Sequence, residues 1–262
     1  QIHGDLVFRG TNLIIGAVRL GESMISGYLS IIGGSGGKSD DSKFIVMNSK
    51  SQRDAISMPG ARIGGSVRLH GNIELMGSIG AECLHVSKTF AIDGGGDSEN
   101  RESLSNNPKR VIIGSSRGVE QKGRYSLFLA KCSVAEGLDL DSDLYFKNSQ
   151  VAGASENFEG NGTARARKEV TVSFSRSKIQ TIAVFQNLEV FGNFLIESAE
   201  IGCDIQFENI RNSKLNHRSL DSISLRQTRI EGELQFKIDG QNGDIGWDGH
   251  YFCLDGARIG TI

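Results

Sequence analysis

The chain has 262 residues, of which 34 are Gly and only 2 are Pro, with 38% hydrophobic and 7% aromatic residues. Its 29 basic and 31 acidic residues give a formal charge of −2, which provides no field that would select nucleic acid or an anionic membrane. No apolar run reaches the roughly 18 residues of a membrane-spanning helix, so we expect no transmembrane segment and no nucleic-acid partner.

Alternation of apolar and other residues begins at the first positions of the chain, with Ile2, Leu6 and Phe8. Its clearest later passage is 61–69, where a period of two predicts a strand. In this strand we expect the aliphatic side chains to point inward and the arginines to point outward. The inward set is Ile63, Val67 and Leu69, and the outward set is Arg62 and Arg68.

An 11-residue pattern recurs without a break from Val172 to Phe207. Its equivalent first positions are Val172, Ala183, Phe194 and Ile205. Related units occur at 56–69, 127–140, 223–236 and 252–259, so one repeat family spans the chain. We expect equivalent side chains eleven residues apart to lie over one another inside a wound chain, and two units to form one coil of about 22 residues.

The predicted fold class is all-β, a right-handed parallel β-helix or solenoid of about 22 residues per coil with polar loop insertions. Short strands separated by corners favour this architecture over a sandwich, which needs hairpin turns. Gly at recurring places suits tight corners, and parallel crossovers are generally right-handed. We expect residues 1–262 to form a single domain.

Polar segments interrupt the repeat at five places and bury little apolar area. They lie near 33–43, 93–110, 150–168, 211–221 and 237–249. Because the same unit recurs on both sides of each segment, we interpret them as insertions between coils and not as linkers between domains. Both ends of the chain stop inside the pattern, so we expect a fragment of a longer chain, or open ends covered by a protein partner or by self-association.

The four cysteines, Cys83, Cys132, Cys203 and Cys253, have neither C-x-x-C pairing nor zinc-like spacing. Cys132 falls at the small position of its unit and Cys203 at the position usually held by Gly. We therefore expect buried or half-buried free thiols and no metal site, which favours a reducing, cytoplasmic compartment.

Two passages, 60–69 (GARIGGSVRL) and 256–260 (GARIG), resemble the G-A-x-I-x-G-x-L-x-L repeats of large bacterial β-solenoid proteins. More loosely, they are similar to bactofilins and pentapeptide-repeat proteins. Bactofilins are compact, so the segments 93–110 and 150–168 depart from that family, and the pentapeptide register is not kept. The resemblance implies a bacterial scaffold or binding body and transfers no catalytic residue.

Paired carboxylates are the main candidates for chemistry. Asp139 and Asp141 alternate with Leu138 and Leu140, so the two aspartates share the outward face of a predicted strand. Such a pair can hold calcium or act on a polysaccharide, as in lyases and hydrolases of this architecture. The competing interpretation is a solvated strand face without chemistry.

Aromatic residues offer a second candidate site. Trp247, Tyr251 and Tyr145 can form a platform for sugar rings, whereas the alternative role for such residues is to pack a loop against the body. The five histidines form no H-x-H or H-x-x-x-H pair, and Gly36–Ser39 shows only the end of a phosphate-loop motif. The sequence therefore predicts no cofactor.

The predicted function is a non-enzymatic structural scaffold or protein-binding β-solenoid domain of a bacterial protein, with the polar insertions as contact elements. The alternative is a polysaccharide-binding or polysaccharide-degrading β-helix that uses Asp139, Asp141 and nearby basic residues. The sequence leaves open whether the protein is an enzyme and favours a protein that is not.

Overall fold

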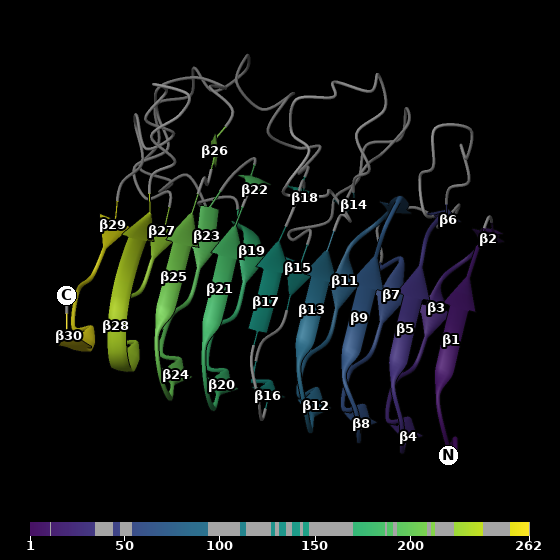
Figure 1. The fold of residues 1–262 in the computed structure, drawn as a ribbon, viewed down its shortest axis with the longest axis horizontal. Coiled ribbons are helices and arrows are strands. Elements are labelled where there is room, and N and C mark those ends of the chain that lie inside the picture. The colour runs from purple at the N-terminus through teal and green to yellow at the C-terminus, as the bar shows by residue number, and fades with distance from the viewer. Residues whose placement is uncertain are drawn as a thin grey trace, which may run out of the picture.

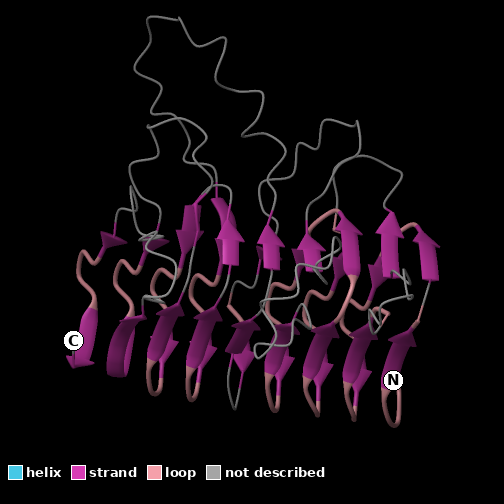
Figure 2. Cartoon of the chain, turned by 45° about the horizontal axis from the view of Figure 1, so that its top comes forward, coloured by secondary structure: helices cyan, strands magenta, loops and turns pink. Residues whose placement is uncertain are grey.

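The computed structural model describes residues 1–10, 12–34, 44–47, 54–93, 111–113, 127–128, 131–134, 138–141, 144–146, 170–186, 188–190, 193–208, 211–212, 223–237 and 252–261. These ranges contain 30 strands and no helix, which confirms the predicted all-β class for the described residues (Figures 1 and 2). The two termini lie at opposite ends of the body (Figure 1).

The strands form four parallel ladders, which the chain visits in a constant order (Figure 1). Ladder 1 consists of β1 (Leu6–Arg9), β5 (Leu29–Ile32), β9 (Val67–His70), β13 (Phe90–Asp93), β17 (Leu138–Asp141), β21 (Ala183–Gln186), β25 (Ile205–Glu208) and the second half of β28 (Arg229–Lys237). Ladder 2 consists of β2 (Asn12–Ile15), β6 (Phe44–Met47), β10 (Ile73–Met76), β14 (Val111–Ile113), β18 (Leu144–Phe146), β22 (Leu188–Val190) and β26 (Arg211–Asn212).

Ladder 3 consists of β3 (Val18–Arg19), β7 (Ile56–Ser57), β11 (Ile79–Gly80), β15 (Leu127–Phe128), β19 (Val170–Ser173), β23 (Asn193–Leu195), β27 (Ile223–Ser224) and β29 (Phe252–Cys253). Ladder 4 consists of β4 (Met24–Ile25), β8 (Arg62–Ile63), β12 (His85–Val86), β16 (Ser133–Val134), β20 (Lys178–Ile179), β24 (Glu200–Ile201), the first half of β28, and β30 (Arg258–Thr261). The long strand β28 joins ladders 1 and 4 into one 15-stranded sheet.

The pairing register shows the repeat length directly. Val67 pairs with Phe90 and Ala183 pairs with Ile205, so the chain returns to the same ladder after about 22 residues where no insertion intervenes. We call one such passage through the four ladders a coil. Every named strand pair is parallel, so the ladders are compatible with a chain that winds through successive coils. Ile223 pairs with Phe252, so this coil is longer than the uninterrupted ones.

One expectation about the repeat is wrong. Val172 lies in β19 of ladder 3, whereas Ala183, the equivalent position of the next unit, lies in β21 of ladder 1. The residue paired with Val172 is Phe194, two units along the chain. One unit therefore advances the chain by two of the four ladders: from ladder 3 past ladder 4 to ladder 1, or from ladder 1 past ladder 2 to ladder 3. Side chains stack at every second unit.

The predicted alternation of 61–69 is confirmed. Ile63, Val67 and Leu69 are buried, whereas Arg62 and Arg68 are exposed. Burial of the same kind continues through the described part of all four ladders and produces one apolar core. Six fully buried phenylalanines reinforce this core, namely Phe44, Phe90, Phe174, Phe185, Phe194 and Phe207.

The ladders keep their register across the longest sequence intervals. Val86 pairs with Val134, and Val134 pairs with Ile179, although each of these intervals is about twice as long as an ordinary coil. Most residues of the five predicted insertions lie outside the described ranges, although Asp93 ends β13, Arg211–Asn212 form β26 and Lys237 ends β28. Extra sequence between strands therefore leaves the pairing of these rungs unchanged.

Candidate functional site

The corner between ladders 3 and 4 repeats the same turn along the body. We call its second turn positions the corner row, which consists of Glu22, Gly60, Cys83, Lys131, Arg176, Ser198, Gln227 and Gly256. Their φ angles lie between 54° and 68°, in the left-handed region that non-Gly residues rarely adopt. In all but one of these turns, the residue after the corner row is a small side chain of the repeat, such as Ala61 or Ser177.

Backbone hydrogen bonds hold this corner in place. The amide of Glu22 donates to the Pro59 carbonyl on the next coil at 2.8 Å, and the amide of Arg176 donates to the Glu197 carbonyl at 2.8 Å. These bonds join neighbouring coils. They offset the steric cost of the left-handed conformation, which is about 1–2 kcal/mol for each residue. The corner row therefore presents its side chains at the regular spacing of the coils.

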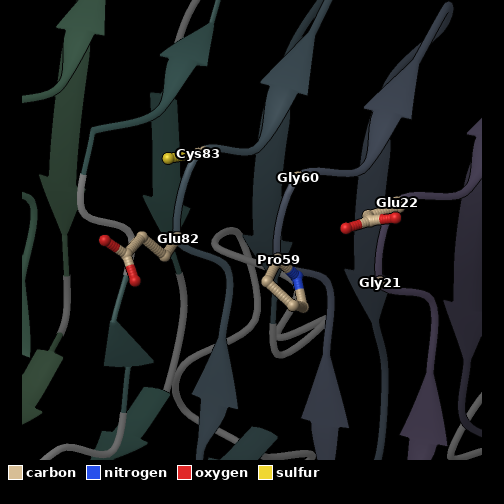
Figure 3. Close-up of a pocket in the computed structure, with 6 residues that line it drawn as sticks. All are labelled: Gly21, Glu22, Pro59, Gly60, Glu82 and Cys83. Carbon is tan, nitrogen blue, oxygen red and sulfur yellow. The ribbon is translucent and has the colours of Figure 1, made fainter.

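A shallow groove of about 390 Å³ crosses the corner row near the N-terminal end (Figure 3). Gly21 and Gly60 carry no side chain, so no side chain fills the space between the neighbouring turns at these two positions. Glu22 borders the groove on one side, and Glu82 and Cys83 border it on the other. The groove is thus lined by two carboxylates, a thiol and the ring of Pro59.

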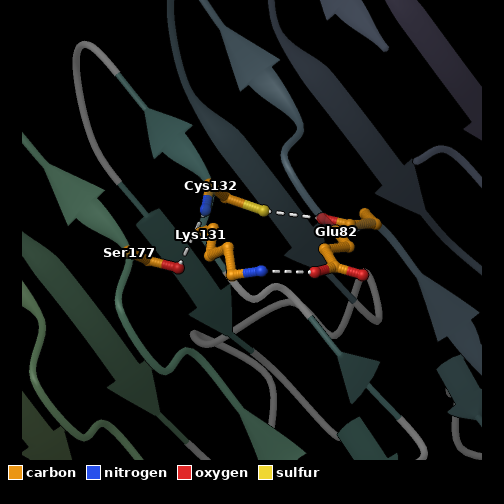
Figure 4. A network of polar contacts seen from close by, with 5 residues as sticks. Glu82, Lys131, Cys132 and Ser177 are labelled. Carbon is orange, nitrogen blue, oxygen red and sulfur yellow. Dashed lines mark hydrogen bonds and ion pairs between the residues drawn. The ribbon is translucent and has the colours of Figure 1, made fainter. Parts of the chain in front are cut away.

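Glu82 connects this groove to the next coil. Lys131 Nζ donates to Glu82 Oε1 at 2.8 Å, and about half of each side chain is exposed (Figure 4). The hydrogen bond and the charge of Glu82 raise the pKa of Lys131. The Glu82 carboxylate therefore forms an ion pair with Lys131 on the side of the carboxylate away from Pro59.

Cys132 lies directly behind this ion pair, in the core. Its Sγ donates to the Ala81 carbonyl at 2.7 Å, while its backbone amide donates to Ser177 Oγ at 3.2 Å (Figure 4). Burial raises the pKa of the Cys132 thiol to about 12. Since the thiolate is the nucleophile, Cys132 is a packing residue and not a reactive one.

The four cysteines are free, as predicted, but only Cys132 is buried. Cys83 and Cys203 are exposed and Cys253 is half-buried, so the expectation of buried or half-buried thiols is wrong for Cys83 and Cys203. Both occupy corners, where the side chain leaves the core. A backbone hydrogen bond from Asp255 lowers the pKa of Cys253, and Arg226 Nη2, which donates to Sγ at 3.5 Å, adds to this effect.

The predicted carboxylates Asp139 and Asp141 lie on β17 of ladder 1. By register, Asp139 is paired with Ala91, and Asp141 is paired with Asp93 on β13. His70, on β9, places its Nδ1 3.0 Å from Asp93 Oδ2. The structure thus brings Asp141 to the strand position next to a His–Asp pair that the sequence analysis did not identify.

Of the three predicted aromatic residues, the structure describes only Tyr145. Tyr145 lies on β18 of ladder 2, in register with Ile112 and Glu189. Trp247 and Tyr251 lie outside the described residues. The aromatic platform therefore stays a prediction.

Sequence reasoning missed the His70–Asp93 pair and the corner row, although spacing contained a signal for both. His70 and Asp93 are 23 residues apart, which is one coil. Corner-row residues stand one place before the small position of the repeat. Residue types alone reveal neither the 23-residue spacing nor the corner-row position, because both are defined only once each residue has been assigned a position in the coil.

Searches against known proteins provide no family. No family model, no curated protein and no solved structure matches this chain. Within the described ranges, no cluster of three or more His, Cys, Asp or Glu side chains is arranged to hold a metal ion. The same ranges contain no helix with the length and apolarity needed to cross a membrane.

Proposed function

We propose that this chain is a right-handed parallel β-solenoid, with about 22 residues per coil, that serves as a structural scaffold or protein-binding domain of a bacterial protein and is not an enzyme. The regular steps from Val67 to Phe90 and from Ala183 to Ile205 within one ladder support the coil length. The general right-handedness of parallel crossovers supports the winding sense. The resemblance of 60–69 and 256–260 to bacterial solenoid repeats supports the source.

One observation supports a scaffold most directly, namely that the register is maintained across long sequence intervals. Ile63, Val86, Val134 and Ile179 are successive partners in ladder 4, although the first interval is an ordinary coil and the next two are about twice as long. A continuous ladder with an apolar core has a fixed spacing of surface side chains. Polar segments that are inserted without changing the strand register can contact partners while the ladders keep their structure.

Deletion of the polar segments tests this proposal. Variants that replace 94–110, 150–168 or both with a short Gly-Ser linker should retain the melting profile of the parent chain and lose one or more partners in a pull-down. Retention of every partner by the double deletion, with an unchanged melt, would contradict the role of these segments. Loss of the cooperative melt would instead contradict their placement between coils.

We propose the terminal strands of the described ladders as a second place for contact, with a further part of the same protein, with a partner protein or through self-association. At the last rung, Phe236, Phe252 and Leu254 remain exposed although their equivalents in earlier coils are buried. At the first rung, Leu6 and Phe8 are only partly buried. An exposed strand edge with apolar neighbours is a site for pairing with another chain.

We propose as the alternative a polysaccharide-binding or polysaccharide-degrading β-helix. The His70–Asp93 pair, with Asp141 at the adjacent strand position, favours this candidate. Carboxylates at about 4.8 Å intervals along a ladder can accept hydrogen bonds from sugar hydroxyls or bind calcium. Asp93 holds the imidazole of His70, which is a group suited to proton transfer.

Screening acidic and neutral glycans with and without calcium tests this alternative. Turnover or binding that is abolished by Asp139→Ala or Asp141→Ala, and retained by Gln206→Ala on the same ladder, would support it and overturn the scaffold proposal. No binding of any glycan by the parent chain would leave the scaffold as the better account.

A further inference from the structure

Three exposed cations lie close together where the chain passes from ladder 4 to ladder 1. Arg62 is on β8, Arg68 is on β9 of the same coil, and Lys88 lies between β12 and β13 of the next coil (Figure 1). The amide of Lys88 donates to the carbonyl of Gly65, midway between the two arginines, at 3.2 Å. We call Arg62, Arg68 and Lys88 the basic patch.

Paired strands flank the patch on both sides. In ladder 4, β8 pairs with β4 and with β12. In ladder 1, β9 pairs with β5 and with β13. The exposure of the two arginines is therefore a property of the outward face of the ladders and not of a terminal strand.

Other cations of ladder 4 have carboxylate partners, whereas those of the basic patch have none. Lys178 Nζ lies 3.1 Å from Glu200 Oε2, and Arg229 Nε lies 2.6 Å from Glu231 Oε1. Among the described residues, no carboxylate forms an ion pair with a cation of the basic patch. The patch is therefore a local excess of positive charge in a chain whose formal charge is −2.

Carboxylates on the surrounding surface leave this excess in place. Glu22 and Glu82 border the groove at the preceding corner, and Glu82 is paired with Lys131 at 2.8 Å. Asp93 is on the strand next to β9, where its Oδ2 lies 3.0 Å from His70 Nδ1. The acidic groove and the basic patch are thus separate, neighbouring parts of one surface.

Tyr28, whose side chain is exposed, positions the third cation. A Cβ at Gly65 would lie 2.9 Å from Tyr28 Cδ1, so the ring lies against the glycine between the two arginines. Lys88 Nζ lies over the same ring, 5.9 Å from its centroid. A cation held over an aromatic face keeps its charge, so Lys88 is kept beside the arginines with its charge available to a ligand.

We propose that the basic patch binds an acidic segment of a protein partner, through Asp or Glu carboxylates. A guanidinium presents its donors in a planar fork that matches a carboxylate, and two such forks lie side by side here. Arg and Tyr are also the residue types enriched at protein interfaces. This inference rests on the proposed protein-binding scaffold and specifies the chemistry of one partner.

The surroundings of Tyr28 favour a protein segment over an acidic polysaccharide. A sugar ring that stacked on Tyr28 would displace Lys88 from the face of the ring, because Lys88 already lies there. A peptide carboxylate needs only the cations and leaves the contact between Lys88 and Tyr28 intact. An acidic polysaccharide is the competing occupant, and the experiment includes it.

Fluorescence anisotropy on the full chain at low ionic strength tests the patch, with a labelled peptide of alternating Glu and Ala as the probe. The parent chain should bind this peptide and should not bind the same peptide with Gln in place of Glu. Arg62→Gln combined with Arg68→Gln should weaken binding by at least about fivefold, because two charged contacts are lost. Added salt should weaken binding by the parent chain, since exposed charges are screened.

Arg229→Gln is the matched control, because Arg229 lies on the same outward row of ladder 4 as Arg62 but is paired with Glu231. It should leave peptide binding unchanged. Arg62→Glu combined with Arg68→Glu should abolish binding of the acidic peptide and allow binding of a peptide of alternating Lys and Ala. Because the substituted side chains are exposed, every variant should keep the parent melting profile.

Three outcomes would overturn the proposal. They are no binding of the acidic peptide by the parent chain, equal weakening by Arg229→Gln, and tighter binding of an oligogalacturonate of the same charge. The last result would assign the patch to an acidic polysaccharide. The patch lies outside 94–110 and 150–168, so its failure leaves the pull-down of the polar segments unaffected, and the two proposals fail independently.

Discussion

Lys131 and Glu82 form an ion pair of 2.8 Å across two successive coils, although 49 residues separate them in the sequence. The pair exists because both residues belong to the same stacked corner, where the chain returns once per coil. Its side chains are half exposed, and exposed pairs contribute little to stability. Position in the coil, and not pairwise attraction, therefore determines which residues meet on this surface.

The left-handed conformation of the corner row leads to the first prediction. Arg176 has a φ of 57°. Arg176→Gly should preserve or slightly raise the stability, since the relief of steric strain, about 1–2 kcal/mol, is offset by the backbone entropy of Gly. Arg176→Val should destabilise the fold by at least about the same 1–2 kcal/mol, because a β-branched residue fits this region poorly.

Thermal or denaturant unfolding of the two variants measures this difference. Lys178→Val, on the neighbouring strand β20, is the control, since β-branched residues are favoured in strands. Equal effects of Val at positions 176 and 178 would contradict the left-handed corner.

The second prediction concerns thiol reactivity. Because the backbone hydrogen bond from Asp255 and the guanidinium of Arg226 lower the pKa of Cys253, this thiol should have a larger thiolate fraction at neutral pH than an unperturbed cysteine. Its alkylation rate should therefore decrease less than that of a model peptide when the pH is lowered from about 8.5 to about 7. Cys132, with a pKa of about 12 and a buried Sγ, should react only after unfolding.

Iodoacetamide labelling followed by peptide mass spectrometry measures both rates. Arg226→Gln removes the hydrogen bond to Sγ and should slow the labelling of Cys253 while leaving Cys132 protected. Labelling of Cys132 in the native chain at the rate of the exposed Cys83 would disprove the assignment.

Charge in the core gives the third prediction. Ile201 is 1% exposed, and its neighbour Glu200 on β24 is exposed. Ile201→Asp would bury a carboxylate without a partner, at a cost of several kcal/mol. We expect the cooperative melt to be lost, whereas Glu200→Gln should melt like the parent chain. A calorimetric scan in which both variants keep the parent transition would place Ile201 outside the core.

The fourth prediction compares two phenylalanines of the same aromatic cluster. Phe194 is fully enclosed, with its ring centroid 4.9 Å from that of Phe185, whereas Phe252 is 37% exposed on the last rung. Phe194→Ala should cost about 3–5 kcal/mol of unfolding free energy, as expected for a buried aromatic residue. Phe252→Ala should cost clearly less, because part of its surface already contacts water. Equal losses in urea unfolding would contradict the exposed last rung.

Periodicity in the sequence predicts the strands well and their stacking only in part. Ile63 and Arg62 are assigned to the correct faces, because alternation in a strand directly reflects burial. Val172 and Ala183 are assigned to one stack although they lie in different ladders, because a period alone does not specify how many units complete one circuit.

The candidate site shows the same limit. Asp139 and Asp141 are identified from their alternation, but the pairing of Asp141 with Asp93 depends on which strands are neighbours on either side of a long polar segment. The Glu82–Lys131 pair likewise depends on coil register across an interval of irregular length. Residue types alone contain no information about such pairs until the register is known.

The strand register is kept from Ile63 through Val86 and Val134 to Ile179, although the sequence intervals between these residues differ greatly in length. The number of residues between two strands therefore does not set the distance between them. A foreign peptide or a small folded module spliced after Asp93 would change the residue count without changing the distance from one rung to the next. The body is for this reason a natural frame for display, on which inserted cargo can be arranged at intervals set by the strands that flank it.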